Sequence, residues 1–241
     1  ASTLMLFQSH AYRLLMVKRA RQLAFFPNAW VFPGGRVDED DADIPTQGVI
    51  EGLDETSYGV AALRECFEEA GVWIGLGNPS ASFRNDLNHR KARLLDDTRL
   101  VADLGRLVFF SRWVTPVSEP KRYDTYFFLA QLTENETMVP QADQHETVES
   151  AWLSPLEAVE KHNRGEIFLA PPTLITLMEL SKYKSFAELL TAPRNFTPIM
   201  PVHRRNPDLE ILLPGHEGHE SKEALFAYTR LRLIDGVWNL D

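Results

Sequence analysis

One amphipathic helix constrains this sequence more than any other feature. Residues 58–70 follow the N-cap candidates Thr56 and Ser57 and end at Gly71, a residue typical of a helix C-cap. At about 100° per residue, one side of this helix is apolar and carries Val60, Leu63, Cys66, Phe67 and Ala70. The rest of the chain must therefore provide a core for this side to pack against.

The opposite side of the same helix collects Glu65, Glu68 and Glu69. Their spacings of three and four residues make the side chains neighbours, and like charges at these spacings repel by a few tenths of a kcal/mol per pair. The adjacent Arg64 supplies one positive charge, whereas hard divalent cations prefer clustered carboxylate oxygens. The pattern indicates either a solvated acidic face or a site for a hard divalent cation.

Composition limits the classes of protein that this chain can belong to. With 44% hydrophobic and 24% charged residues among 241, the sequence predicts one elaborated globular domain with a sizeable core. The net charge of −9 argues against nonspecific binding to nucleic acid or to an anionic membrane. The single cysteine, Cys66, excludes an intrachain disulfide and is expected to be a small buried residue of its helix. No stretch approaches the roughly 20 apolar residues of a membrane span, so we expect a cytoplasmic protein.

Acidic residues are concentrated ahead of the helix. Between Arg36 and Arg64 the chain has no lysine or arginine, but it has eight carboxylates: Asp38, Glu39, Asp40, Asp41, Asp43, Glu51, Asp54 and Glu55. We expect residues 38–43 to form a solvated, mobile loop.

Hydrophobic patterns predict the other elements. Strands are expected at 12–17, 30–32, 72–74, 107–114, 126–132, 152–153, 209–213, 230–234 and 237–238, the last two joined by an Asp235-Gly236 turn. Helices are expected within 85–104, at 155–162 and within 172–190. Strands 107–114 and 126–132 are predicted to form an antiparallel pair.

The chain resembles the Nudix hydrolases, whose signature is G-x5-E-x7-R-E-U-x-E-E-x-G-U with U a bulky apolar residue. Residues 64–71 match its R-E-x-x-E-E-x-G part at every fixed position, and the preceding Phe-Pro-Gly-Gly at 32–35 is frequent in that family. The signature has 13 residues between its glycine and its arginine, whereas 28 separate Gly35 from Arg64. Counted back from Arg64, the first glutamate of the signature falls on Thr56, one position from Glu55.

The 15 additional residues, together with segments 111–116, 121–128 and 168–173, resemble the Nudix subgroup that includes the peroxisomal coenzyme A diphosphatase of animals. A coenzyme A signature, L-L-T-x-R-[SA]-x3-R-x3-G-x3-F-P-G-G, is matched at Arg19, Ala20 and 32–35. Ala24 stands in place of its second arginine and Asn28 in place of a glycine.

The resemblance implies a metal-dependent diphosphatase with coenzyme A or an acyl-coenzyme A as the leading small-molecule substrate. One alternative is ADP-ribose, a dinucleotide or another nucleoside diphosphate derivative. The other is a nucleotide-sensing module without turnover. Nucleic acid and membrane partners are not expected, and the oligomeric state stays open.

The resemblance also implies an α/β/α sandwich around a mixed sheet, formed by a single domain over 1–241. We expect a loop insertion at about 36–57, a helical insertion at about 78–105 and a C-terminal β extension at about 196–241.

Site residues follow from the same resemblance. The equivalents of Glu65, Glu68 and Glu69 and the carbonyl of Gly35 bind Mg²⁺ or Mn²⁺, and the equivalent of Arg64 orients a helix carboxylate. A further carboxylate commonly precedes a Trp-containing strand, for which Glu146 is the first candidate and Glu149 the second. The candidates for binding substrate phosphates through charge-assisted hydrogen bonds are Arg19, Arg36, Lys121 and Arg122.

Overall fold

The computed structural model describes residues 1–23, 26–136, 138–192, 194, 196–205 and 207–240, so Ala24 of the coenzyme A signature lies outside it. Its centre is an eight-stranded mixed sheet in the order β11-β3-β2-β1-β9-β8, with β10 paired to β2 and β4 to β1. The strands are β1 (Ser2–Phe7), β2 (Leu14–Arg19), β3 (Ala29–Val31), β4 (Gly34–Gly35), β8 (Val108–Val114), β9 (Asp124–Gln131), β10 (Thr147–Leu153) and β11 (Phe168–Leu169). The predicted antiparallel pairing of β8 with β9 is confirmed.

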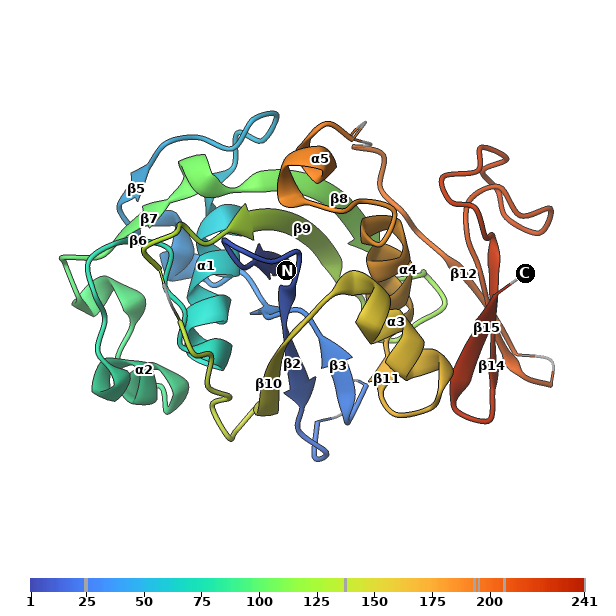
Figure 1. Cartoon of the computed structure of the whole chain (residues 1–241), viewed down its shortest axis with the longest axis horizontal. Helices are drawn as coiled ribbons and strands as arrows, with labels where there is room; N and C mark the ends of the chain where they lie inside the picture. Colours follow the sequence, from blue (N-terminus) through green and yellow to red (C-terminus); the bar gives the residue numbers. More distant parts are fainter. Residues whose placement is uncertain (24–25, 137, 193, 195, 206, 241) are drawn as a thin grey trace.

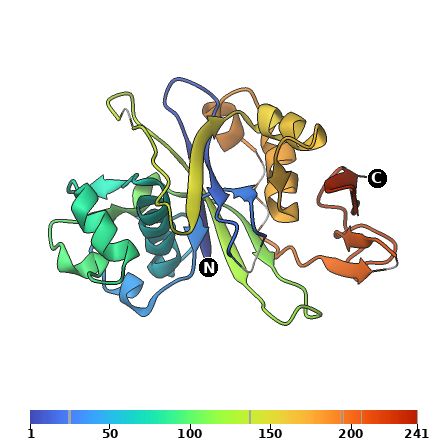
Figure 2. The same cartoon turned by 90° about the horizontal axis from the view of Figure 1, so that it is seen from below.

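Helices cover both faces of this sheet, which confirms the predicted α/β/α layers. Helix α1 (Thr56–Ala70) lies on one face, and α3 (Pro155–Asn163) and α4 (Pro171–Leu180) lie on the other (Figures 1 and 2). The alternating side chains of β2 divide between the two cores: Leu15 and Val17 pack with α1, and Leu14 and Met16 pack on the other side.

The central strand β1 is absent from the sequence-based prediction. Its residues 4–7 are fully buried, and it runs parallel to β9 with Leu4 paired to Phe128. A strand covered on both faces has a continuous apolar run without polar alternation. The period-two pattern used to find strands is therefore missing here.

Helix α1 has the predicted end and C-cap but begins at Thr56, two residues before the predicted start. Gly71 has a φ of 74°, in the left-handed region, and its N–H donates to the carbonyl of Phe67 at 2.8 Å. The N-cap is Glu55, not Thr56 or Ser57. A Cβ at Gly59 would lie 2.6 Å from the Ile50 side chain and 2.8 Å from that of Leu104, so glycine permits close packing of the preceding loop on α1.

The two insertions pack together. In the first, η1 (Glu39–Ala42) precedes β5 (Thr46–Gln47). The strand β6 (Gly75–Leu76) leads into the second, which is formed by α2 (Ala81–Asn88), η2 (Leu94–Asp96), β7 (Val101–Asp103) and η3 (Leu104–Arg106). Strand β7 pairs with β5 and β6 in a small sheet. The expectations for this region are partly wrong. The only α-helix described within 85–104 is the end of α2, and the predicted strand at 72–74 is replaced by β6.

After α5 (Phe186–Leu190), the chain forms a second sheet from β12 (Val202–Arg205), β13 (Leu209–Leu212), β14 (Arg230–Ile234) and β15 (Val237–Leu240), which confirms a C-terminal β extension. Buried Trp238 fastens this sheet to the main body. Its backbone N–H donates to His162 Nε2 at 3.1 Å, and its indole N–H donates to the Leu169 carbonyl at 3.1 Å. Among the described helices, none has the length and apolar character needed to cross a membrane.

Candidate active site

The three glutamates of α1 are not a solvated acidic face. Glu69 is 3% exposed and accepts a hydrogen bond from the Gly34 N–H at 3.0 Å. The side chains of Glu65 and Glu68 are 13% and 23% exposed. Strand β4 and the 3₁₀ helix η1 cover this side of α1. The carboxylates thus lie between α1 and these two segments.

The two glycines of β4 permit the close approach of this strand to α1. A Cβ at Gly35 would collide with the carboxylate of Glu65, and a Cβ at Gly34 would collide with the backbone of β1. Packing therefore requires Gly34, whereas a side chain at Gly35 would displace the Glu65 carboxylate. The candidate metal-binding carbonyl of Gly35 lies in the same segment as the Glu65 carboxylate.

Arg64 organises the carboxylates from the interior. It is 6% exposed, and its Nη1 donates to Glu65 Oε1 at 3.1 Å and to both Glu68 oxygens at 3.3 Å. Its Nη2 donates to the carbonyl of Arg36 at 2.7 Å. One guanidinium therefore orients two of the three glutamates and holds the chain that follows Gly35.

The remaining partner of Arg64 is Asp41, which corrects the expectation of a solvated loop at 38–43. Arg64 Nε and Nη2 donate to the two oxygens of Asp41 at 2.8 Å and 3.0 Å, and Asp41 is only 1% exposed. The Asp38 N–H also donates to Asp41 at 2.8 Å. Burial of the guanidinium requires a buried counter-charge, and this aspartate provides it.

The sequence contained a signal for Asp41. Counted forward from Gly35, the glutamate of the G-x5-E signature falls on Asp41, whereas counting back from Arg64 leads to Thr56. Glu55 lies at the other end of α1, about 15 Å along the helix from Glu65, and accepts a hydrogen bond from the Ser57 hydroxyl. The additional residues thus follow Asp41 and leave its spacing from the glycine intact.

Burial leaves the carboxylates with unusual proton affinities. Burial and nearby Glu68 raise the pKa of Glu65 to about 7, although Arg64 opposes the shift. Burial and then Glu65 raise the pKa of Glu69 well above its ordinary value, against the Gly34 N–H and Arg19. Burial also raises the pKa of Glu68. These hard oxygen donors, with too little positive charge around them, suit a divalent cation.

In the described ranges, no three His, Cys, Asp or Glu side chains are already grouped as a metal site. The oxygens that would bind a cation point instead to Arg64 and to the Gly34 N–H. The donor chemistry fits a hard cation, and binding requires that these side chains turn toward it.

The structure separates the two candidates for the additional carboxylate. Glu146 lies close enough to raise the pKa of both Glu65 and Glu69, and its carbonyl accepts a hydrogen bond from the Ala20 N–H at 2.8 Å. Glu149 forms an ion pair with Lys18. Because Lys18 and Arg19 are consecutive in β2, their side chains point to opposite faces of the sheet. Glu146 and Arg19 are therefore on the side of the glutamates, and Glu149 is not.

The other cationic candidates lie in exposed segments. Arg36 follows β4 directly and is exposed. Lys121 lies 5.4 Å from the ring centre of Tyr123, and Arg122 donates to the Thr115 carbonyl at 3.0 Å. The structure thus brings Arg36 next to the glutamates and anchors Arg122 within the β8–β9 loop.

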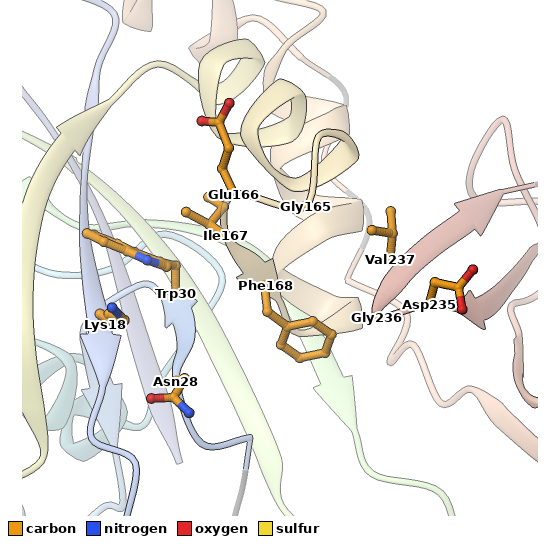
Figure 3. A pocket seen from close by; sticks show the side chains of 10 residues that line it. All are labelled: Lys18, Asn28, Trp30, Gly165, Glu166, Ile167, Phe168, Asp235, Gly236 and Val237. Carbon is orange, nitrogen blue, oxygen red and sulfur yellow. The ribbon is translucent and has the colours of Figure 1, made fainter.

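A cavity of about 320 Å³ lies elsewhere (Figure 3). Lys18, Trp30, Phe168 and the Asp235-Gly236 turn are among the residues that line it. Lys18 points away from the α1 face, so this cavity and the glutamates are on opposite sides of β2.

The described geometry has clear counterparts among known proteins. The sequence model of the NUDT19 Nudix domain matches residues 51–180, more than half of the chain. The chain is 32% identical over 181 residues to nudix hydrolase 7 of Caenorhabditis elegans, covering 72% of the chain and 57% of that protein. It is 29% identical over 245 residues to the acyl-coenzyme A diphosphatase NUDT19 of Gallus gallus, covering 74% of the chain and 63% of the relative.

The human acyl-coenzyme A diphosphatase NUDT19 is 27% identical over 241 residues, covering 75% of the chain and 64% of the relative. The chain thus spans less than two thirds of the length of each of these three curated relatives. A solved NUDIX hydrolase from Alicyclobacillus acidocaldarius superimposes with a TM-score of 0.69 at 26% identity, covering 80% of this chain and 96% of the other. Sequence and structure therefore point to one family.

Proposed function

The chain belongs to the Nudix hydrolase family, and from this premise we propose that it hydrolyses the diphosphate linkage of a nucleoside diphosphate derivative. The observation that carries the proposal is the cluster of three partly or fully buried glutamates that Arg64 and the Gly34 N–H hold, with Asp41 as the counter-charge of Arg64. Coenzyme A or an acyl-coenzyme A is the leading substrate, supported by relatives named acyl-coenzyme A diphosphatases and by the partial match at Arg19.

We propose that Glu65, Glu68, Glu69 and the Gly35 carbonyl hold Mg²⁺ or Mn²⁺. Such a cation, when bound, neutralises charge on the diphosphate and lowers the pKa of a water molecule. The chain supplies the placement. Arg64 keeps Glu65 and Glu68 together against their mutual repulsion, and the Gly34 N–H orients Glu69.

The other roles are assigned by position. Glu146 accepts the proton of the attacking water at a carboxylate oxygen, since it lies near Glu65 and Glu69 but outside the Arg64 network. Arg19, beside Glu69, and the exposed Arg36 contact substrate phosphates, with Lys121 and Arg122 as more distant candidates. Water adds across the P–O–P bond, and coenzyme A is split into adenosine 3′,5′-bisphosphate and phosphopantetheine.

A panel of diphosphates tests the proposal. The protein is incubated with coenzyme A, an acyl-coenzyme A, ADP-ribose and a dinucleotide, each with Mg²⁺ or Mn²⁺ and each with a chelator. We expect metal-dependent cleavage, fastest for the coenzyme A compounds. Binding of a nucleotide without any turnover under all conditions contradicts the enzyme assignment. If ADP-ribose is cleaved fastest, the assignment as a diphosphatase stands and coenzyme A is rejected as the preferred substrate.

A further inference from the structure

The carboxylate of Glu146 has no hydrogen-bond donor among the residues that the structure describes, so the backbone around it determines where it lies. This backbone belongs to the segment that leads into β10 and runs beside α1 (Figure 1). Near its start, the Gln141 N–H donates to the Ala70 carbonyl at 3.0 Å. The position of Glu146 relative to the other glutamates therefore depends on the turn at 143–147.

One carboxylate organises this turn. Asp143 Oδ1 accepts the backbone N–H groups of His145 at 3.0 Å, Glu146 at 3.1 Å and Thr147 at 2.8 Å. The turn includes Gln144 with a φ of 65°, a left-handed conformation that residues other than glycine adopt only when their surroundings impose it. Asp143 provides that constraint.

The turn is also fastened to α1. The buried Thr147 hydroxyl lies 3.0 Å from the Glu69 carbonyl and 3.0 Å from Asp143 Oδ1, and it accepts the Asp143 N–H at 3.2 Å. Arg84 strengthens the connection, since its Nε donates to the Glu68 carbonyl at 3.0 Å and its Nη2 donates to the Gln141 carbonyl at 2.7 Å. Hydrogen bonds thus join the last turn of α1 to the segment that carries Glu146.

We propose that Asp143 is a positioning residue that sets the place of Glu146 relative to Glu65 and Glu69, with Thr147 as its link to α1. The inference rests on the proposed role of Glu146 and adds the part of the chain that makes this role possible. Asp143 acts through the backbone and does not touch the substrate.

A double-mutant cycle tests it, with Asp143→Ala, Glu146→Gln and the double variant compared on the diphosphate that the panel identifies as the best substrate. Glu146→Gln should lower kcat by about 10²-fold or more, as expected for loss of a general base. Asp143→Ala should lower kcat about ten-fold with KM within two-fold, and should lower it no further when Glu146 is already Gln. Asp143→Asn, which keeps an acceptor oxygen, should recover most of the loss.

Two further comparisons separate positioning from folding. Thr147→Val should reproduce the fall in kcat and Thr147→Ser should retain activity, because serine keeps the hydroxyl that lies near the Glu69 carbonyl. Glu188→Ala is the matched control, since Glu188 accepts the backbone N–H of Lys184 at 2.8 Å in an exposed turn of α5. It should leave kcat and KM unchanged.

The outcomes distinguish the inference from the function on which it rests. Wild-type kcat in Glu146→Gln overturns the role of Glu146 and the inference with it. The inference alone is overturned if Glu146→Gln lowers kcat but Asp143→Ala does not. It is also overturned if Asp143→Ala lowers kcat by the same factor whether residue 146 is Glu or Gln.

Discussion

Asp41 and Arg64 are 23 positions apart in the chain and form two hydrogen bonds, of 2.8 Å and 3.0 Å, between almost fully buried side chains. The pair connects the segment after β4 to the helix that carries Glu65, Glu68 and Glu69. Because the same guanidinium also contacts Glu65 and Glu68, its position affects both stability and the geometry of the site.

Replacing Asp41 should therefore affect both properties. Asp41→Asn removes the charge that faces buried Arg64 and should lower the free energy of unfolding by about 2–4 kcal/mol, measured by urea denaturation. We expect a fall in kcat as well. Asp43→Asn, an exposed substitution in the same segment, should change neither quantity measurably. Equal stability of the two variants would show that Arg64 does not need Asp41.

Glu69 should be essential for turnover and dispensable for folding. Glu69→Gln removes a buried charge while leaving the apolar side of α1 intact, so kcat at saturating Mg²⁺ should fall by at least 10²-fold. Melting in EDTA should show equal or higher stability than the wild type, because a neutral amide is easier to bury. Glu68→Gln should lose turnover similarly. Wild-type kcat in either variant means that its metal-binding role is wrong.

A divalent cation should stabilise the folded protein. A ligand that binds only the folded state adds about 2.7 kcal/mol at 100 times its Kd. Titration with Mg²⁺ or Mn²⁺ should thus raise the Tm of the wild type, and Glu69→Gln should reduce the increase. Sodium chloride at equal ionic strength is the control. An unchanged Tm across millimolar divalent cation argues against a site formed in the folded state.

His162 should make docking of the C-terminal sheet sensitive to acid. A neutral ring with its proton on Nδ1 can donate to the Ile167 carbonyl and accept the Trp238 N–H at Nε2, and burial lowers the pKa of His162. The unfolded chain, with a histidine pKa of about 6.5, binds a proton first as the pH falls. The stabilisation is therefore complete above about pH 6.5 and is lost as the pH falls toward the folded-state pKa.

The measurement is Tm between pH 7.5 and 5 for the wild type and His162→Gln, whose side-chain oxygen can accept the Trp238 N–H without titrating. We expect the difference in Tm between the two proteins to shrink or reverse on acidification. If Tm depends on pH in the same way in both proteins, protonation of His162 is not coupled to unfolding.

Arg19 should contribute to the choice of substrate. Coenzyme A carries a 3′-phosphate that dephospho-coenzyme A lacks, and a cationic contact would distinguish them. We predict a higher kcat/KM for coenzyme A, and loss of most of this preference in Arg19→Ala, whereas Glu69→Gln depresses both substrates alike. Equal kcat/KM for the two compounds in the wild type rejects the coenzyme A assignment and leaves the diphosphatase mechanism standing.

The local patterns of the sequence were sufficient for several elements. Apolar residues at helical spacing predicted α1 and its end at Gly71, and Asp235-Gly236 predicted the β14–β15 hairpin, both now confirmed. These patterns suffice because the spacing of apolar residues reflects the period of a helix, and the residue types of a turn reflect its backbone conformation. Strand β1 lacks such a period because it is covered on both faces, and the strands of the insertions, with two or three residues each, are too short to show one.

The sequence by itself determined that three carboxylates share one side of α1 next to a single arginine, and that a Gly-Gly pair precedes them. Only the tertiary structure decided that this side is buried, that Asp41 among eight nearby acids neutralises Arg64, and that Glu146 and not Glu149 lies on the side of the glutamates. The reason is physical: helical periodicity places residues a few positions apart, whereas burial and charge pairing depend on which distant segments pack together. Because burying an unpaired guanidinium is energetically costly, Arg64 needs a buried counter-charge, and the packing of the chain determines that Asp41 provides it.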